Sequence, residues 1–339
     1  MLEHGGKILA ASRKYGIAPE HWLDLSTGVS PFSYPVKDVP QSAWHYLPQA
    51  DDGLEDSAKN YYQCEQLLAA AGSQPIIQTL PKLRQTSRVV VLQNTYREHP
   101  YAWNREGHIL VQVGGEHIED HLKTADVVVL CNPNNPSGET FSTERLLHWA
   151  DALAQRGGWL VVDEAFADTN PEMSLARFGG RPGLVVLRSV GKFFGLAGAR
   201  VGFLIAPPEL LLVMAESLGP WTVTGPSRSV VKEALMDSKW QTEATANLKA
   251  SAKDLETVLR EQGLEPTGST DFFHWVKTPA AQQIHESLAS QGILTRFFEV
   301  PASIRFGLPP DKKALDRLLN VLANLPAEYK QSNLSSSRS

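Results

Sequence analysis

The stretch DVVVLCNPNNPSG, residues 126–138, decides the fold of this chain. It begins with a continuous apolar run and ends with two prolines, three asparagines and a glycine, residue types that form turns. A short apolar run bounded by turn residues predicts a strand that is buried on both faces, as in a parallel sheet. Open α/β sheets bind their ligands beyond the carboxyl ends of such strands, so this loop is a candidate ligand site.

Further β-branched runs repeat this pattern along the chain, with helical patterns between them. They lie at 89–92, 109–113, 159–162, 184–187 and 201–205. One intervening helix is marked by Ser142 as its N-cap and by Gly157 as its end. Strands that alternate with helices predict an α/β fold with a mostly parallel sheet.

The remaining patterns are helical or belong to a smaller unit. Residues 53–71 are typical of one helix, and Pro75 suits the first turn of the next. Residues 226–262 predict a long helix that is broken near Ser238. Short runs at 274–276, 293–298 and 303–306 indicate a small α+β unit.

The composition excludes several classes of protein. The net charge is −5 and no basic block offsets it, which argues against nucleic acid or an anionic membrane as a partner. Two cysteines, Cys64 and Cys131, favour a reducing compartment over a disulfide framework. No apolar run approaches the roughly 20 residues that cross a bilayer, and the N-terminus lacks the apolar core of a secretory signal. We therefore expect a cytoplasmic protein.

Two further polar motifs follow predicted strands. Asp163 ends the run at 159–162, and a buried carboxylate there could pair with a protonated ring nitrogen. Lys192 follows the run at 184–187 and is flanked by Phe193 and Phe194, whose apolar surroundings would make its amine a better Schiff-base nucleophile. Ser189 and Arg200 on either side could hold an anion. An amine, a carboxylate and an asparagine at one sheet edge suit pyridoxal 5'-phosphate.

In order and spacing, Asn135, Asp163, Lys192 and Arg200 resemble the fold type I aminotransferases, in particular the histidinol-phosphate aminotransferase group. The N-terminal third, with HGG at 4–6 and WLDLSTGVSP at 22–31, is similar to the threonine-phosphate decarboxylases of cobalamin biosynthesis. This resemblance implies a seven-stranded, mostly parallel sheet with helices on both faces, plus a smaller α+β domain. It also implies a PLP-dependent carboxy-lyase that converts L-threonine O-3-phosphate to (R)-1-amino-2-propanol O-2-phosphate and CO2.

The resemblance assigns roles around the cofactor. It implies that Lys192 binds the cofactor covalently, that Asp163 pairs with the pyridine nitrogen, and that Asn135 contacts the ring hydroxyl. Tyr96 would stack on the ring. The cofactor phosphate would be held by Ser73, Gln74, Ser189 and Arg200, and by the partner subunit's Tyr46 in a homodimer.

The substrate residues follow from the same resemblance. Arg305 would hold the carboxylate, and Arg296 would hold the phosphate together with His4 and the Gly5 amide, because the planar fork of arginine matches both anions. Asn135 and Gly28 complete the expected substrate contacts, with Gly28 acting through its backbone where relatives carry asparagine. Phe166 stands where many of these aminotransferases have tyrosine.

We expect four segments along the chain: 1–52 in the small domain and the substrate site, 53–236 as the large PLP-binding domain, 237–326 as the rest of the small domain, and 327–339 as a disordered tail. The expected partners are a phospho-amino acid and a second copy of the chain, with a transient complex with a later cobalamin-pathway enzyme as a further prediction. We expect no metal, since HIEDH at 117–121 lacks the zinc-protease spacing.

Two alternatives remain open from the sequence. A histidinol-phosphate aminotransferase-like transaminase would share the cofactor residues, so the motifs indicate the cofactor better than the reaction. An aminotransferase-like ligand-sensing regulator would carry an N-terminal DNA-binding segment, and only some 20 residues precede Leu23 here.

Overall fold

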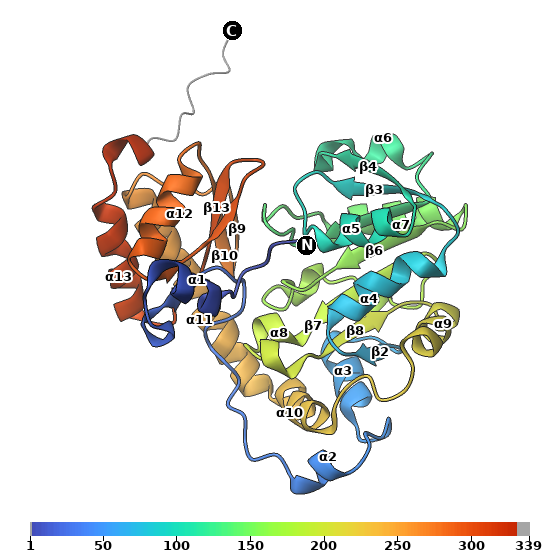
Figure 1. Cartoon of the computed structure of the whole chain (residues 1–339). Helices are drawn as coiled ribbons and strands as arrows, with labels where there is room; N and C mark the ends of the chain where they lie inside the picture. Colours follow the sequence, from blue (N-terminus) through green and yellow to red (C-terminus); the bar gives the residue numbers. More distant parts are fainter. Residues whose placement is uncertain (1, 331–339) are drawn as a thin grey trace. The chain divides into compact units, whose positions relative to one another are not determined.

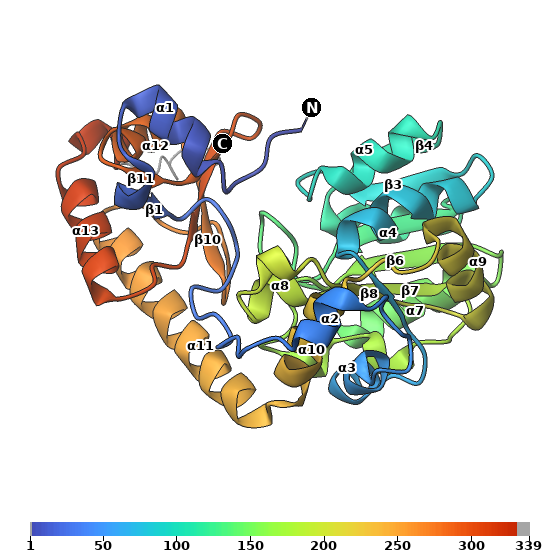
Figure 2. The same ribbon diagram turned by 60° about the horizontal axis from the view of Figure 1, so that its bottom comes forward.

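The computed structural model describes residues 2–330, which divide into two compact units (Figures 1 and 2). The smaller unit comprises the described residues of Met1–Phe32, Pro136–Gly138 and Ala244–Ser339, and the larger unit comprises Ser33–Asn135 and Glu139–Glu243. The domain limits expected from the sequence, at 52/53 and 236/237, stay predictions. Of the tail expected at 327–339, Ala327–Tyr329 form a 3-10 turn, and residues 331–339 lie outside the described part.

The larger unit contains a seven-stranded sheet with the order β2-β8-β7-β6-β5-β3-β4. Neighbouring strands from β4 to β7 are parallel, whereas β8 is antiparallel to both β7 and β2. The strands are β2 (Leu68–Ala70), β3 (Arg88–Leu92), β4 (Ile109–Val113), β5 (Val127–Cys131), β6 (Trp159–Asp163), β7 (Leu184–Ser189) and β8 (Gly202–Ile205). The predicted mostly parallel sheet of seven strands is confirmed.

Both faces of β3 and of β5 to β8 are buried, which explains the continuous apolar runs of these strands. Val127 and Val129 pack in one core with residues of α4 (Ser73–Thr79), α5 (Glu98–Arg105) and α9 (Pro208–Leu218). Val128 and Leu130 point to the opposite face because side chains alternate along a strand, and they are buried as well. On that face α7 (Thr143–Ala154) packs against β6. Helices therefore cover both faces of the sheet.

The helix expected before β6 is confirmed with its end signals. The Ser142 hydroxyl accepts a hydrogen bond from the Arg145 amide, at 3.2 Å, and thereby caps α7. The chain leaves this helix through Gly157, whose φ of +68° favours glycine.

The single helix expected at 53–71 is wrong in its second half. Helix α3 (Leu54–Tyr62) ends at Gln63, which takes the left-handed conformation, and Leu68–Ala70 form β2. Three small apolar residues give a weak strand signal on their own. Their pairing with β8 decides the conformation, because it satisfies the backbone groups of both strands.

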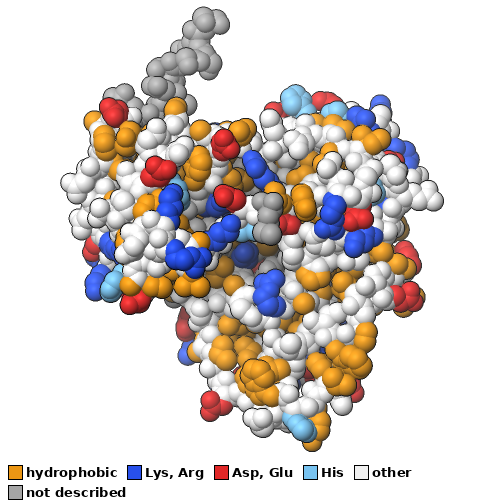
Figure 3. Space-filling model, viewed as in Figure 1, with side chains coloured by type: hydrophobic (Ala, Val, Ile, Leu, Met, Phe, Trp, Pro, Cys, Tyr) orange, Lys and Arg blue, Asp and Glu red, His pale blue; other side chains and the backbone are white. Residues whose placement is uncertain are grey.

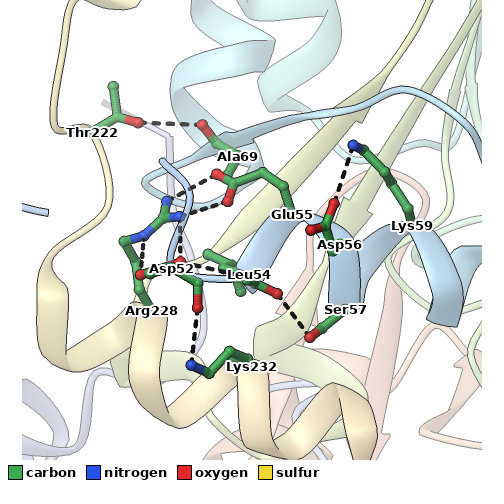
Figure 4. A network of polar contacts seen from close by, with 11 residues as sticks. Asp52, Leu54, Glu55, Asp56, Ser57, Lys59, Ala69, Thr222, Arg228 and Lys232 are labelled. Carbon is green, nitrogen blue, oxygen red and sulfur yellow. Dashed lines mark hydrogen bonds and ion pairs between the residues drawn. The ribbon is translucent and has the colours of Figure 1, made fainter. Parts of the chain in front are cut away.

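The long helix expected at 226–262 is interrupted as predicted. It consists of α10 (Gly225–Met236) and α11 (Ser238–Glu261), separated by Asp237. Helix α10 packs on α3, where the Arg228 guanidinium bridges the carboxylates of Asp52 and Glu55 (Figure 4). The other helices of the larger unit are α2 (Gln41–His45), α6 (Ile118–His121) and α8 (Val190–Phe193).

The smaller unit has an antiparallel sheet with the order β12-β13-β10-β9 and a parallel pair β1-β11. These strands are β1 (Leu23–Asp24), β9 (Gly268–Thr270), β10 (Phe273–Lys277), β11 (Ile293–Leu294), β12 (Arg296–Phe298) and β13 (Ser303–Gly307). Helices α1 (Ile8–Tyr15), α12 (Ala281–Ser290) and α13 (Lys312–Ala323) complete the unit with most of α11. The small α+β unit is confirmed.

Within residues 2–330 no helix combines the length and the apolar character that a membrane span requires.

Candidate active site

A pocket of the larger unit opens at the carboxyl ends of β5, β6 and β7. Its walls are Ser73, Gln74, Tyr96, Cys131, Asn135, Asp163, Ala165, Phe166, Ser189, Lys192 and Arg200. Eight of these residues are the cofactor-binding residues expected from the sequence in the same unit. The carboxyl ends of parallel strands meet at one edge of a sheet, so residues far apart in the sequence come together there.

The asparagine loop is held by two of its three asparagines. The Asn132 side chain donates a hydrogen bond to the Phe141 carbonyl and accepts one from the Phe141 amide. The Asn134 side-chain amide donates to the Asn94 carbonyl at 2.6 Å. Both side chains are buried. Of the three asparagines, Asn135 is the one that lines the pocket.

Asp163 lies at the end of β6 and pairs with His99 from α5. Both residues are buried, and His99 Nε2 lies 3.0 Å from Asp163 Oδ2. Burial disfavours the imidazolium, but the contacts with Asp163 and Cys131 outweigh it and raise the pKa of His99 to about 10. The second oxygen, Asp163 Oδ1, accepts from the Ala165 amide at 3.1 Å. The carboxylate is thus fixed in place next to a cation.

Tyr96 and Gln74 form another part of the pocket wall. The Tyr96 hydroxyl lies 3.5 Å from Gln74 Oε1, and burial, reinforced by Glu98 and Asp163, raises the pKa of Tyr96 above its usual value. Gln74 Nε2 donates to Glu98 at 2.7 Å. This orients the Gln74 carbonyl oxygen toward the tyrosine, which stays protonated and lines the pocket.

Lys192 projects from α8, directly after β7. Its ammonium lies 5.8 Å from the centre of the Phe166 ring. Phe193 and Phe194 pack instead against Trp240, with the Phe194 and Trp240 rings stacked at 5.5 Å. The aromatic neighbour of the amine is therefore Phe166, and the two flanking phenylalanines anchor α8.

Arg200, Ser73 and Ser189 surround one end of the pocket. A Cβ at Gly72 would lie 2.7 Å from Arg200 Nη2, and a Cβ at Gly202 would lie 2.6 Å from the Ser73 amide nitrogen. Two glycines thus leave room for the guanidinium and for a backbone amide at the same place. Hydroxyl, amide and guanidinium donors form a set that suits a phosphate group.

These side chains fit pyridoxal 5'-phosphate. A primary amine, a carboxylate paired with a histidine, a tyrosine ring and a set of anion donors line one pocket. Each of these groups suits a different part of the cofactor: its aldehyde, its pyridine nitrogen, its ring face and its phosphate.

The model of the family "Aminotransferase class I and II" matches residues 41–322. This chain belongs to that family. As a family member it is a pyridoxal-phosphate enzyme, and the fold and the cofactor implied by the resemblance are confirmed.

Two curated relatives are similar over nearly the whole chain. A threonine-phosphate decarboxylase of Pseudomonas aeruginosa is 48% identical, over 94% of this chain and 96% of its own length. A threonine-phosphate decarboxylase of Sinorhizobium sp. is 39% identical, over 96% of this chain and 98% of its own length. A histidinol-phosphate aminotransferase of Haemophilus influenzae is 30% identical, but the match covers only 53% of this chain and 50% of the relative.

Solved structures share the aminotransferase fold. A histidinol-phosphate aminotransferase from Sinorhizobium meliloti, in complex with pyridoxal-5'-phosphate, aligns with a TM-score of 0.82 at 21% identity, over 95% of this chain and 94% of its own. An L-threonine-O-3-phosphate decarboxylase from Porphyromonas gingivalis aligns with a TM-score of 0.76 at 19% identity, over 88% and 98%.

The substrate residues expected from the sequence lie in the smaller unit, apart from Asn135. Arg305 is buried in β13, donates to the Ser26 carbonyl at 2.9 Å and lies over the Phe273 ring. The Arg296 guanidinium in β12 donates to the carboxylate of Glu3 at 3.5 Å and to the backbone carbonyl of Glu3 at 2.8 Å.

The HGG segment lies against β1 and the loop after it. The Ser26 hydroxyl accepts from the Gly6 amide at 2.7 Å and donates to Asp24 at 2.6 Å. A Cβ at Gly5 would lie 2.3 Å from the Ser26 carbonyl oxygen, so only glycine fits there. This contact places the exposed His4 and the Gly5 amide near the start of the Ser26–Gly28 turn, whose Gly28 is buried.

Two buried residues that the sequence analysis missed contact side chains of the pocket. His99 and Glu98 are buried polar side chains of α5 that orient Asp163 and Gln74. The signal was the tetrad Tyr96-Arg97-Glu98-His99, in which polar residues follow the pocket tyrosine at the start of a helix. Tyr46, expected from the partner subunit, is exposed in the single chain.

Proposed function

We propose that this enzyme is a threonine-phosphate decarboxylase of cobalamin biosynthesis. It decarboxylates L-threonine O-3-phosphate to (R)-1-amino-2-propanol O-2-phosphate and CO2. The observation that carries this proposal is the similarity to two threonine-phosphate decarboxylases over nearly the whole length of both chains. The likeness to the histidinol-phosphate aminotransferase covers only about half of the chain.

Lys192 and Asp163 perform the central steps in this proposal. The cofactor, when bound, accepts the electrons of the bond that breaks at the substrate α-carbon. Lys192 holds the cofactor and returns a proton to that carbon after CO2 has left. Asp163, paired with His99, keeps a proton on the pyridine nitrogen, because a carboxylate next to this nitrogen favours its charged form.

Anion recognition is assigned to arginines in both units. Arg200 with Ser73 and Ser189 binds the cofactor phosphate, whereas Arg305 binds the substrate carboxylate and Arg296 the substrate phosphate. Arginine suits these tasks because its planar fork donates two parallel hydrogen bonds to an oxyanion. The substrate phosphate would replace Glu3 as the anionic partner of Arg296.

The second candidate function is a histidinol-phosphate aminotransferase-like transaminase. This function is supported by the pocket residues Lys192, Asp163 and Asn135, which would serve a transaminase as well as a decarboxylase. The third, a ligand-sensing regulator, has in its favour only the shared fold.

The assignment of Lys192 is tested by reductive labelling. The purified holoenzyme is expected to be yellow, to lose that colour with borohydride, and to carry the reduced cofactor on Lys192 in peptide mass analysis. A matched Lys192→Ala variant should show no covalent label and should lose at least about a thousandfold in kcat, since covalent attachment and proton return both need the amine. A label found on another lysine would overturn the assignment.

The homodimer is part of the proposal. The segment of α2 and the residues after it expose large apolar side chains, and hydrophobic atoms gather over α2 and α10 at the bottom of Figure 3. Exposed clusters of this kind mark interfaces. The exposed large apolar residues of this segment are Trp44, Tyr46 and Leu47, and Trp221 is exposed just before α10. A cytoplasmic location and a transient complex with a later cobalamin-pathway enzyme stay predictions.

A further inference from the structure

Arg188 is a buried cation that the proposed chemistry does not use. It is the penultimate residue of β7 and lies one position before Ser189, which lines the cofactor pocket. Arg188 itself does not line that pocket, because side chains alternate along a strand and its guanidinium points elsewhere.

The guanidinium joins two carboxylates from the loop after β6. Nη1 lies 2.7 Å from Glu164, Nη2 lies 2.9 Å from Asp168, and the group rests 4.6 Å from the centre of the Tyr62 ring. All three charged side chains are almost fully buried. Asp168 also accepts from the Tyr61 hydroxyl at 3.0 Å, so α3 takes part in the cluster.

Glu164 holds the loop in addition. Its carboxylate accepts from the Leu175 amide at 2.6 Å and from the Ser174 hydroxyl at 2.5 Å. Glu164 follows Asp163 directly, and its amide donates to the Leu187 carbonyl at 2.9 Å. The end of β6 and the end of β7 are therefore tied together on the side of the strands that faces away from the cofactor pocket.

A cluster of this kind is poorly explained as a source of stability. Two carboxylates share one cation away from water, and burial raises the pKa of both carboxyl groups. Buried ion pairs often contribute no more to stability than apolar residues of the same volume, although they can fix one geometry. Here the geometry concerns Asp163 on one strand end and Ser189 with Lys192 on the next.

We propose that Arg188 is a positioning residue: its bridge to Glu164 and Asp168 sets the distance between the Asp163 segment and the Ser189–Lys192 segment. The inference rests on the proposed cofactor site. Pocket geometry, and hence cofactor affinity, then depends on a side chain that does not line the pocket.

The test compares cofactor affinity with stability in three variants. Arg188→Met removes the bridge, Arg188→Lys keeps the charge but loses the fork, and His108→Leu is the matched control. His108 is a buried polar residue that bridges the Ser87 amide and the Pro81 carbonyl before β3, at the opposite end of the same sheet. Each apoenzyme is titrated with pyridoxal 5'-phosphate, and its thermal midpoint and the circular dichroism of the bound cofactor are recorded.

We expect Arg188→Met to raise the Kd for the cofactor at least tenfold and to change the cofactor dichroism, with Arg188→Lys between it and the wild type. His108→Leu should lower the thermal midpoint and leave the Kd within twofold. If Arg188→Met does not fold, Arg188→Lys decides, with at least a threefold higher Kd expected. Arg188 variants with a Kd within twofold of the wild type would overturn the inference. Failure of the wild-type apoenzyme to bind the cofactor would instead overturn the proposed function.

Discussion

Asp163 and His99 show how single residues prepare the pocket. The sequence places Asp163 at a strand end, which is enough to predict that it faces a ligand. It does not reveal His99, because the pairing depends on how α5 packs against the sheet. Asn135 was likewise predictable by position, whereas the roles of Asn132 and Asn134 in holding the loop required the structure.

The charge of His99 predicts a dependence of stability on pH. Its pKa is raised from 6.5 to about 10, so its proton stabilises the folded apoenzyme fully below pH 6.5, and this contribution is lost as the pH rises toward 10. We expect the loss in unfolding free energy caused by His99→Asn to be largest near pH 6.5 and to shrink steadily up to pH 10. Urea denaturation of both apoenzymes across this range measures it. A difference that does not vary with pH would contradict the raised pKa.

At the scale of elements, the sequence predicts the strands β3 to β8 of the large sheet but misses its edge strand β2. The β-branched runs became β3 to β8, and all of these strands except the edge strand β4 are buried on both faces. The strand β2 was missed, since Leu68–Ala70 form a strand only through pairing with β8. The break between α10 and α11 was visible in the sequence near Ser238.

Helices α3 and α10 are joined by an ion-pair cluster that can be tested. The Arg228 guanidinium is buried and contacts both Asp52 and Glu55, while the Lys232 ammonium donates to the Asp52 carbonyl (Figure 4). Arg228→Met should lower the free energy of unfolding by about 2 kcal/mol, since it leaves two partly buried carboxylates without their cation. Urea denaturation at neutral pH provides the measurement.

The control for Arg228 is Arg181→Met. Arg181 forms an exposed ion pair with Asp151, and its loss should cost no more than about 0.5 kcal/mol. Equal effects of the two substitutions would mean that burial of the Arg228 cluster adds nothing to stability.

For the whole molecule, the sequence predicts one large cofactor-binding domain and a smaller domain that both ends of the chain form. The structure divides residues 2–330 into two units, and the cofactor pocket lies within one of them. A short stretch, Pro136–Gly138, belongs to the smaller unit although the sequence around it belongs to the larger. Sequence patterns cannot reveal such an excursion, because only tertiary contacts define it. A Cβ at Gly138 would lie 2.4 Å from the Ser269 carbonyl oxygen, which shows how close this approach is.

The apolar patch around α2 predicts self-association. The wild type should sediment at twice the mass of one chain at micromolar concentration. Trp44→Glu should raise the dimer dissociation constant at least tenfold, because it places a charge in the expected interface. Leu9→Glu, at an equally exposed leucine of α1, serves as the control and should leave the dimer intact. A monomeric wild type would refute the homodimer.

The reaction itself is the central claim, and product analysis tests it most directly. The holoenzyme is incubated with L-threonine O-3-phosphate, with and without 2-oxoglutarate, while CO2, amine product and oxo acid are measured. The account predicts one CO2 for each molecule of 1-amino-2-propanol O-2-phosphate, independent of 2-oxoglutarate, and neither product with Lys192→Ala. Consumption of 2-oxoglutarate with an amino donor at a much higher rate than CO2 release would contradict it and establish a transaminase.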